Sequence, residues 1–261
     1  MLVLRKVLLL AVLLMPVLSH PATAAELSLG VDPLVVEFSA GPGGSAHASV
    51  VVNNAGSDAE RVMMMPIDWR TLVDGNIALE RAGTEGSRSL TSSLTLSASG
   101  FVLQPGEART LTLTLAMPQS KPSTPASYWG GFLIEATRPT GSDTGLAPGA
   151  TVFVYDNVGQ PHRHLSLRSL DLVGTGTQTR VEARLVNDVD SYLRIASHMV
   201  VRRGNHVVRD VDVPMNSILP RAERLLQQPL QGLAAGGYRL ELTFDYGGET
   251  ILDGVKQIQI R

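Results

Sequence analysis

The stretch Thr110-Leu111-Thr112-Leu113-Thr114-Leu115 alternates threonine with leucine. Because successive side chains of a β-strand point to opposite faces, this pattern places every leucine on one face and every threonine on the other. A half-buried antiparallel strand requires that arrangement. No segment of comparable length shows a helical period of similar strength, so the sequence predicts an all-β protein.

Other short runs of β-branched and apolar residues surround this stretch, and Gly, Pro, Asn and Asp separate them. Seven strands in this part of the chain are typical of a β-sandwich. The segment Leu90–Leu96 fits either a further strand or an irregular connection. The strands expected in the first half are Leu34–Phe38, Ala46–Val52, Arg61–Ile67, Phe101–Leu103, Arg109–Leu115, Tyr128–Ala136 and Thr151–Tyr155.

A second series of strands follows Gln160-Pro161 and again fills a span of the size of one sandwich. We therefore expect two immunoglobulin-like β-sandwich domains in tandem, over residues 26–159 and 162–261. The strands expected in the second half are Leu165–Leu172, Thr179–Val186, Ile195–Arg202, His206–Val213, Glu223–Gln228, Tyr238–Tyr246 and Ile251–Ile260.

A weak internal repeat also indicates two copies of one domain. A strand that ends in Asn53-Asn54 in the first half parallels one that ends in Asn187 in the second half. The turn Leu103–Arg109 parallels Leu219–Arg224, and Tyr128-Trp129-Gly130-Gly131 parallels Gly236-Gly237-Tyr238. The order of these features is the same in both halves.

The first 25 residues have the pattern of a cleaved secretory signal peptide. Arg5 and Lys6 precede an apolar run over Val7–Leu18, and small residues follow in Pro21–Ala25. The apolar run is shorter than the roughly 20 residues that a membrane-spanning helix needs, so we expect no stable membrane insertion. The sequence thus predicts an exported protein.

Charge and cysteine content limit the classes of function. Removal of Arg5 and Lys6 with the signal leaves 20 basic against 24 acidic residues, which does not favour a nucleic-acid partner. The chain contains no cysteine. Exported domains often rely on disulfides, which these domains cannot form. They must therefore be stabilised by burial alone.

Three segments of the first half together resemble the N-terminal domain of PapD-like periplasmic pilus chaperones. They are Ala48–Asn54, Phe101–Glu107 and Ser127–Phe132, and the second half resembles the C-terminal sandwich of the same family through Leu219-Pro220 and Gly236–Leu240. The resemblance covers nearly the whole mature chain. It implies two domains arranged as a boomerang in the periplasm, with a pilin-like or other surface-fibre subunit as the partner and an outer-membrane usher as a second candidate partner.

In that family the chaperone lends the last strand of its first domain to the open groove of a pilin, which is β-strand addition. The matching segment here consists of Thr151, Val152, Phe153, Val154 and Tyr155, the partner-binding residues that the resemblance implies. Val152 and Val154 lie on one face of the strand, and Phe153 and Tyr155 lie on the other. One face must cover the core of the domain, so the other is either buried beneath the second domain or forms a binding surface.

The sequence departs from the family at the residues that hold the pilin carboxylate. The family uses an Arg on the first strand and a Lys near the end of the last strand. Here the first strand reads Leu34-Val35-Val36-Glu37-Phe38, and the last strand of the first domain has no lysine. The chain is therefore identified as a divergent relative that lacks this Arg and Lys pair.

Metal binding has only weak candidates, and no cofactor is expected. His162 and His164 lie on one face of an extended segment, but no nearby third His or Cys completes a site. Met63-Met64-Met65 places two thioethers on one strand face, which suits Cu(I), although methionine is also a common core residue. Trp69 is expected to fill the core.

Enzymatic activity is not expected, because the sequence has no Gly-x-Ser-x-Gly elbow and no cysteine nucleophile. The leading hypothesis is a periplasmic chaperone or assembly factor for surface-fibre subunits. A structural or adhesive immunoglobulin-like exported protein without chaperone activity is the alternative, and a periplasmic metal carrier is a third hypothesis.

Overall fold

The computed structural model describes residues 27–121, 124–139, 147–214 and 217–260. Almost all of its regular structure is β-strand, which confirms the predicted fold class. The predicted signal peptide, residues 1–25, lies outside the described residues. No helix within the described ranges has the length and apolar character needed to cross a bilayer.

Ten strands form the first domain, which is a sandwich of two sheets. One sheet has the order β1-β3-β8-β6, and the other has the order β2-β10-β9-β4-β5, with β7 also paired to β4. The bounds are β1 Leu29–Asp32, β2 Val35–Phe38, β3 Ser45–Asn54, β4 Glu60–Thr71, β5 Ile77–Arg81, β6 Leu94–Leu96, β7 Gly100–Leu103, β8 Ala108–Ala116, β9 Ala126–Thr137 and β10 Gly149–Val158, with two 3-10 turns, η1 Gly86–Arg88 and η2 Thr91–Ser93.

The second domain is built from β11 to β19. Its sheets have the orders β11-β12-β17 and β15-β14-β18-β19, and β13 pairs with β16. The bounds are β11 Leu165–Val173, β12 Arg180–Asn187, β13 Leu193–Arg194, β14 Ala196–Arg203, β15 His206–Val213, β16 Ser217–Ile218, β17 Glu223–Pro229, β18 Gly236–Asp245 and β19 Leu252–Ile260, with the 3-10 turn η3 Gly176–Gln178. The strand that ends at Val158 pairs within the first domain, and the strand that begins at Leu165 pairs within the second. The predicted domain limits themselves stay a prediction.

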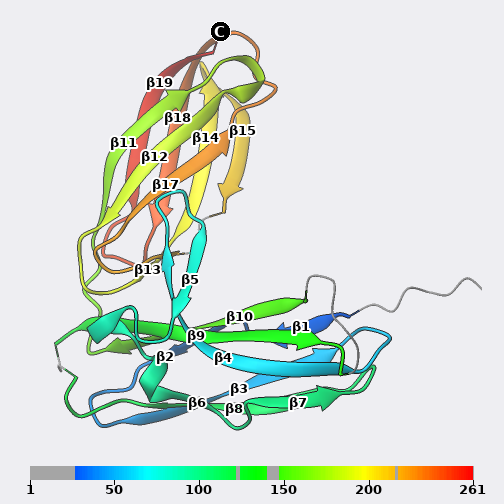
Figure 1. Ribbon diagram of the computed structural model, residues 1–261. Coiled ribbons are helices and arrows are strands. Elements are labelled where there is room, and N and C mark those ends of the chain that lie inside the picture. The colour runs from blue at the N-terminus through cyan, green and yellow to red at the C-terminus, as the bar shows by residue number, and fades with distance from the viewer. Residues whose placement is uncertain (1–26, 122–123, 140–146, 215–216, 261) are drawn as a thin grey trace, which may run out of the picture.

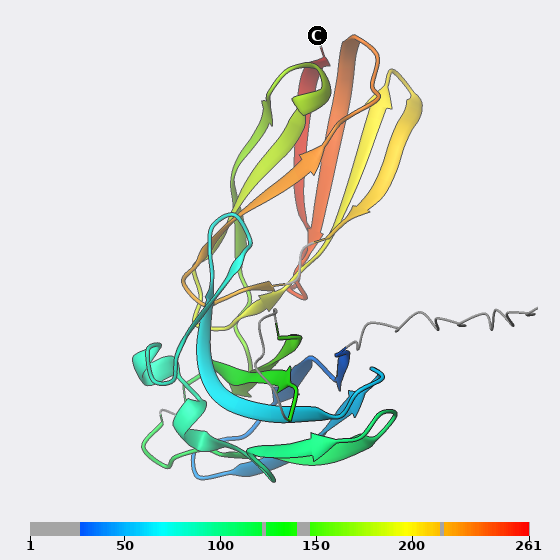
Figure 2. The same ribbon diagram turned by 45° about the vertical axis from the view of Figure 1, so that its right-hand side comes forward.

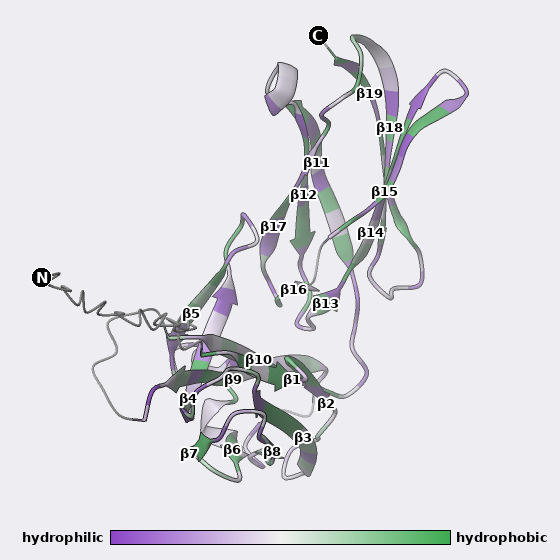
Figure 3. Cartoon of the chain, turned by 90° about the vertical axis from the view of Figure 1, so that its right-hand side faces the viewer, coloured by the Kyte–Doolittle hydropathy of each residue, from purple (hydrophilic) through white to green (hydrophobic). Residues whose placement is uncertain are grey.

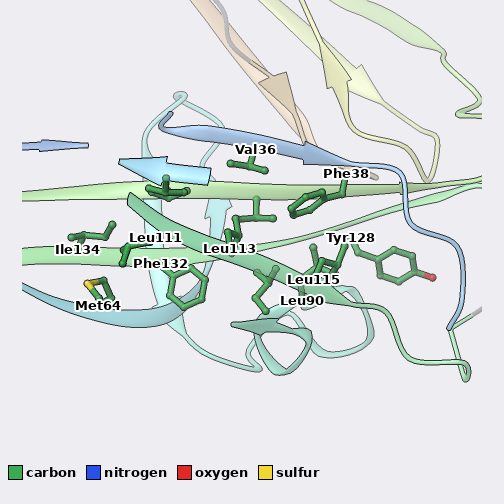
Figure 4. Close-up of a cluster of buried hydrophobic side chains, with 14 of the residues drawn as sticks. Val36, Phe38, Met64, Leu90, Leu111, Leu113, Leu115, Tyr128, Phe132 and Ile134 are labelled. Carbon is green, nitrogen blue, oxygen red and sulfur yellow. The ribbon is translucent and has the colours of Figure 1, made fainter. Parts of the chain in front are cut away.

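Alternating burial explains why these segments are strands. In β8, Leu111, Leu113 and Leu115 are buried, and Thr110 and Thr112 are exposed. The strands accordingly carry alternating hydrophobic and hydrophilic bands (Figure 3). The leucines meet residues of the opposite sheet, such as Val36 and Ile134, in the core of the first domain (Figure 4). The stretch that predicted the fold thus supplies the centre of this core.

A buried asparagine has the same role in both domains, at the strand ends that the internal repeat aligns. Asn54 donates from Nδ2 to the carbonyl oxygens of Asp58 and Leu103, and its Oδ1 accepts from the Gly56 amide. Asn187 donates from Nδ2 to the carbonyl oxygens of Ser191, Ile218 and Leu219, and its Oδ1 accepts from the Val189 amide. Each side chain satisfies backbone groups that are buried or partly buried.

The second domain stands on one end of the first, so that the molecule bends sharply (Figure 1). The hairpin of β4 and β5 rises from the first domain alongside β17 (Figures 1 and 2), and the amide of Leu225 donates to the carbonyl of Val73 at 2.7 Å. On another part of the junction, the amide of Ser127 donates to the carbonyl of Asp190 at 2.8 Å. Backbone contacts therefore join the two domains at more than one place.

Candidate functional site

The strand β10 carries the five predicted binding residues and lies near one edge of the larger sheet. Along its whole length, Gly149–Val158, it pairs antiparallel with β9. Its other side pairs parallel with β2, but only over Phe153–Asp156. The first four residues, Gly149–Val152, therefore have a paired strand on one side only among the described residues.

Two hydrogen bonds establish which backbone groups face the open side. The amide of Ala136 in β9 donates to the carbonyl of Pro148 at 2.9 Å, and the amide of Phe153 donates to the carbonyl of Leu34 at 2.8 Å. Because these groups alternate between the two sides of a strand, those of Thr151 point in the same direction as those of Phe153. Thr151 lies two residues before the point where β2 begins to pair. Its N–H and C=O are available to an added strand.

The side chains of the five residues divide between two environments. Val152 and Val154 are buried in the core of the first domain. Tyr155 is buried and Phe153 is half-buried on the opposite face, which is directed toward the second domain. Thr151 is half-buried. Of the two alternatives predicted for the second face, burial beneath the second domain holds for Tyr155.

An aromatic cluster lies at the junction and joins the two domains. Trp69 contacts Phe153 and Tyr155 edge-on, with ring centroids 4.8 and 5.5 Å apart, and Tyr155 stacks on Tyr192 of the second domain at 4.2 Å. The indole of Trp69 donates to the carbonyl of Gly130 at 3.1 Å, and the indole of Trp129 donates to the carbonyl of Trp69 at 2.9 Å. Trp69 fills a core, as predicted, but that core is the interdomain cluster.

A pocket of about 550 Å³ opens beside this cluster, between the two domains, and is called the cleft pocket here. Leu34, which precedes β2, and Val35, its first residue, line the pocket and are exposed. Phe153 and Ile77 extend the apolar lining, and two arginines of the second domain contribute its positive charge. The cleft pocket therefore adjoins the end of the open edge of β10.

The two arginines of the cleft pocket, Arg194 and Arg224, differ in their partners. Arg194 forms an ion pair with Glu37 at 3.2 Å, and its side chain is mostly exposed. Arg224 donates to the carbonyl oxygens of Ser217 and Gly75, and no carboxylate within the described part of the chain pairs with it. Burial lowers the pKa of Arg224, and the nearby Tyr155 and Asp74 only partly oppose this effect.

Sequence reasoning did not single out Arg194 and Arg224. Strand β2 carries no arginine and strand β10 carries no lysine, so the family's Arg and Lys pair is missing from these two strands. These two arginines belong to the second domain, on β13 and β17. Nothing in the local sequence marks them, because only the packing of the domains brings them to the first domain's edge.

Beneath the site, Asp156 of β10 is a buried carboxyl group in the core of the first domain. Its Oδ1 accepts from the amide of Ala40 at 2.7 Å, and its Oδ2 has no hydrogen-bond partner among the residues described. Burial raises the pKa of Asp156, and the Ala40 hydrogen bond only partly opposes this effect. The folded protein therefore holds this proton more tightly than the unfolded chain does.

We expect Asp156 to make the stability of the protein depend on pH. Because its folded-state pKa is raised, its stabilising effect is complete below the unfolded pKa of about 4 and is lost as pH rises through the folded value. The melting temperature of the wild type should fall over that range, and Asp156→Asn should remove this part of the slope. Thermal melts of both proteins across pH measure it, and equal slopes would contradict the expectation.

Asp171 offers a control of opposite sign for this experiment. The hydrogen bond from Lys256 lowers the pKa of this exposed carboxylate, so its contribution is present above the unfolded pKa and is lost as pH falls through the folded value. Asp171→Asn should therefore leave the loss of stability on raising pH unchanged.

The weak metal candidates do not come together in a site. The Nδ1 of His164 pairs with Asp188 at 2.8 Å, and His162 and His164 both line a shallow surface pocket near Tyr246. In the described ranges, no three His, Cys, Asp or Glu side chains are grouped so that they could hold a metal ion. Met64 is buried, whereas Met63 and Met65 are exposed on the opposite face of β4.

No protein family and no curated protein matches this sequence. Among solved structures, the chain is similar to the YadV chaperone, with 14% identity over 88% of this chain and 99% of that chain and a TM-score of 0.45. It is also similar to the E. coli chaperone DraB, with 15% identity, coverage of 90% and 98%, and a TM-score of 0.42.

A third similar structure is a chain of the CsuC–CsuE chaperone–tip adhesion subunit pre-assembly complex of Acinetobacter baumannii, with 12% identity, coverage of 89% and 98%, and a TM-score of 0.45. These likenesses concern the arrangement of the backbone. The function has to be inferred from the residues of the chain itself.

Proposed function

We propose that this chain is a periplasmic chaperone or assembly factor that binds a surface-fibre subunit by β-strand addition. The observation that carries the proposal is the open side of β10 at Gly149–Val152, where β2 does not yet pair. An unpaired row of N–H and C=O groups is a template for a strand of another chain. The partner strand that we infer would bind there through backbone hydrogen bonds, which need no particular sequence.

The start of β2 sets the point at which the partner strand must end. An added strand would continue the line of β2, and it cannot extend past Leu34 because β2 occupies that side of β10 from Phe153 onward. At this point the partner chain meets the cleft pocket, which Leu34, Val35 and Phe153 help to line. We infer that the end of the partner strand enters this pocket.

The charge of the pocket favours a carboxylate at that end. Arg224 is partly desolvated and forms no ion pair among the described residues, the charge of Asp74 only partly offsets the desolvation, and Arg194 lines the same pocket. A charge-assisted hydrogen bond to a carboxylate would compensate the desolvated charge. In this proposal the two arginines bind the terminal carboxylate for which the resembling family uses an Arg and a Lys.

Capture of the partner from its own compartment tests the proposed function. The full mature chain, carrying an affinity tag, is expected to recover a β-rich subunit from the native periplasm that aggregates when it is released. An outer-membrane usher would be recovered only with the loaded complex. Recovery of no such subunit would contradict the chaperone function and favour a structural or adhesive protein.

Replacing Arg224 with methionine is expected to weaken this capture about tenfold, because one charge-assisted hydrogen bond to the partner is lost. Methionine keeps much of the apolar stem that packs in the pocket. Quantitative pull-down of the recovered subunit measures the change.

Arg168→Met serves as the matched control, because Arg168 is an exposed arginine of the second domain that contacts Glu223. It should leave capture unchanged. Full capture by an Arg224→Met protein with a normal melting temperature would show that the carboxylate is not bound there, without affecting the proposed edge of β10.

A further inference from the structure

A second pocket, called the junction pocket here, lies where the loops of the first domain meet Asp190 of the second. Its volume is about 640 Å³, and it shares no lining residue with the cleft pocket. The residues that characterise it are Ser87, Arg88, Ser120, Lys121, Tyr128 and Asp190.

Two cations lie over one aromatic ring in this pocket. The Nζ of Lys121 lies 4.5 Å from the centroid of the Tyr128 ring, and the guanidinium carbon of Arg88 lies 5.7 Å from it. Figure 4 shows Tyr128 at one end of the core cluster, with its hydroxyl directed away from the other side chains. The core thus fixes the position of the ring. Because both cations lie over it, two like charges are close together.

Acidic groups do not balance these charges. Arg88 donates to Asp190 at 2.6 Å, but Asp190 also accepts two hydrogen bonds from Arg221, at 2.8 and 3.2 Å. Lys121 donates to the carbonyl oxygen of Ser87 and contacts no carboxylate within the described ranges. Among the residues that line the pocket, Asp190 is the one acid, and two arginines already share it.

The electrostatics of Lys121 agree with this imbalance. Burial lowers its pKa, and the charge of Arg88 lowers it further. A negative group placed beside Lys121 would reverse both effects, because it would replace lost hydration and offset the repulsion between the two cations.

We propose that the junction pocket binds an acidic peptide segment of a partner protein, with one of its carboxylates on Lys121. The pocket has a volume typical of sites for ligands much larger than a single small anion. Ser87 and Ser120 also line the pocket, and their hydroxyls can donate further hydrogen bonds. This interaction is independent of strand addition at β10.

Calorimetric titration of the full mature chain at low salt tests the proposal. The probe is a blocked tetrapeptide of aspartate and glutamate, and the matching peptide of asparagine and glutamine is its uncharged counterpart. The acidic peptide should bind and the amide peptide should not. Lys121→Met should weaken binding about tenfold, and Lys121→Arg should retain most of it.

Arg109→Met is the matched control, because Arg109 also lies over an aromatic ring, Phe101, at 4.7 Å, but outside the pocket. It should leave the affinity unchanged. Equal binding of both peptides would overturn the proposal, as would full affinity in Lys121→Met. Binding of inorganic phosphate in place of the acidic peptide would also overturn it, since the pocket would then be a small-anion site.

Discussion

Replacing Thr151 with proline is expected to reduce capture of the partner subunit at least about thirtyfold. Proline removes the N–H that faces the open side of β10, and its ring occupies the space that an added strand needs. The bond donated by the Thr151 N–H is lost, and so is the bond accepted by its C=O when the ring holds the added strand away; at about 1 kcal/mol each, these two losses account for the factor. Quantitative pull-down from the native periplasm measures it.

The same substitution should leave the fold intact, because the Thr151 amide does not take part in the ladder with β9. Ala150, the residue before the new proline, is already in an extended strand, which the proline favours. Thr151→Val is the matched control, since it changes the side chain but keeps the N–H, and it should capture normally. Normal capture by a folded Thr151→Pro protein would exclude strand addition at this edge.

The position of the substitution matters for this test. Val152 is 1% exposed and faces the core of the first domain. Aspartate at Val152 would bury a charge and unfold the domain, so loss of capture would carry no information about binding. Thr151 allows the backbone of the edge to be altered without disturbing that core.

Replacing Trp69 with alanine is expected to lower the free energy of unfolding by about 3–5 kcal/mol, as is usual when a buried tryptophan is truncated. Trp69 is 1% exposed, contacts Phe153 and Tyr155 edge-on, and donates to the carbonyl of Gly130. Its removal takes away contacts of the first domain and weakens the cluster that includes Tyr192 and Leu219 of the second domain.

Urea unfolding followed by the fluorescence of Trp129 measures this loss, because Trp129 is the other tryptophan of the chain and lies in the same cluster. Trp69→Phe should cost less, since a ring remains in contact with Phe153 and Tyr155. Ile251→Ala is the control: Ile251 is 58% exposed, so its truncation should change stability by no more than about 0.5 kcal/mol. A loss below about 1 kcal/mol for Trp69→Ala would contradict the role assigned to the cluster.

The strands that the sequence predicted correctly are those with strong alternation or high β-branched content. Both the leucines of β8 and the valines of β10 mark their strands in this way. The short strands β1, β13 and β16 were not predicted, because each pairs with a strand that is distant in the sequence. The hairpin strand β5 pairs with its neighbour β4 but was not predicted either, because none of its residues is buried and its apolar alternation is weak.

The candidate site, too, could be predicted from the sequence only in part. The sequence and its resemblance pointed to Thr151–Tyr155, and alternation showed that Val152 and Val154 would lie on one face. It did not show that β2 pairs with Phe153–Asp156 and leaves Gly149–Val152 open. That outcome requires the chain at Leu34 to lie beside a strand more than a hundred residues later, which no local pattern specifies.

By itself the sequence determined that this protein is all-β and has two sandwich cores, because side-chain periodicity decides which face of each strand avoids water. Only the tertiary structure decided which edge of β10 stays open and which charges surround it. Arg194 and Arg224 reach the cleft pocket, and Lys121 and Arg88 share the ring of Tyr128, because segments distant in the sequence pack together. Electrostatic interactions depend on distance in space, and distance in space is set by packing.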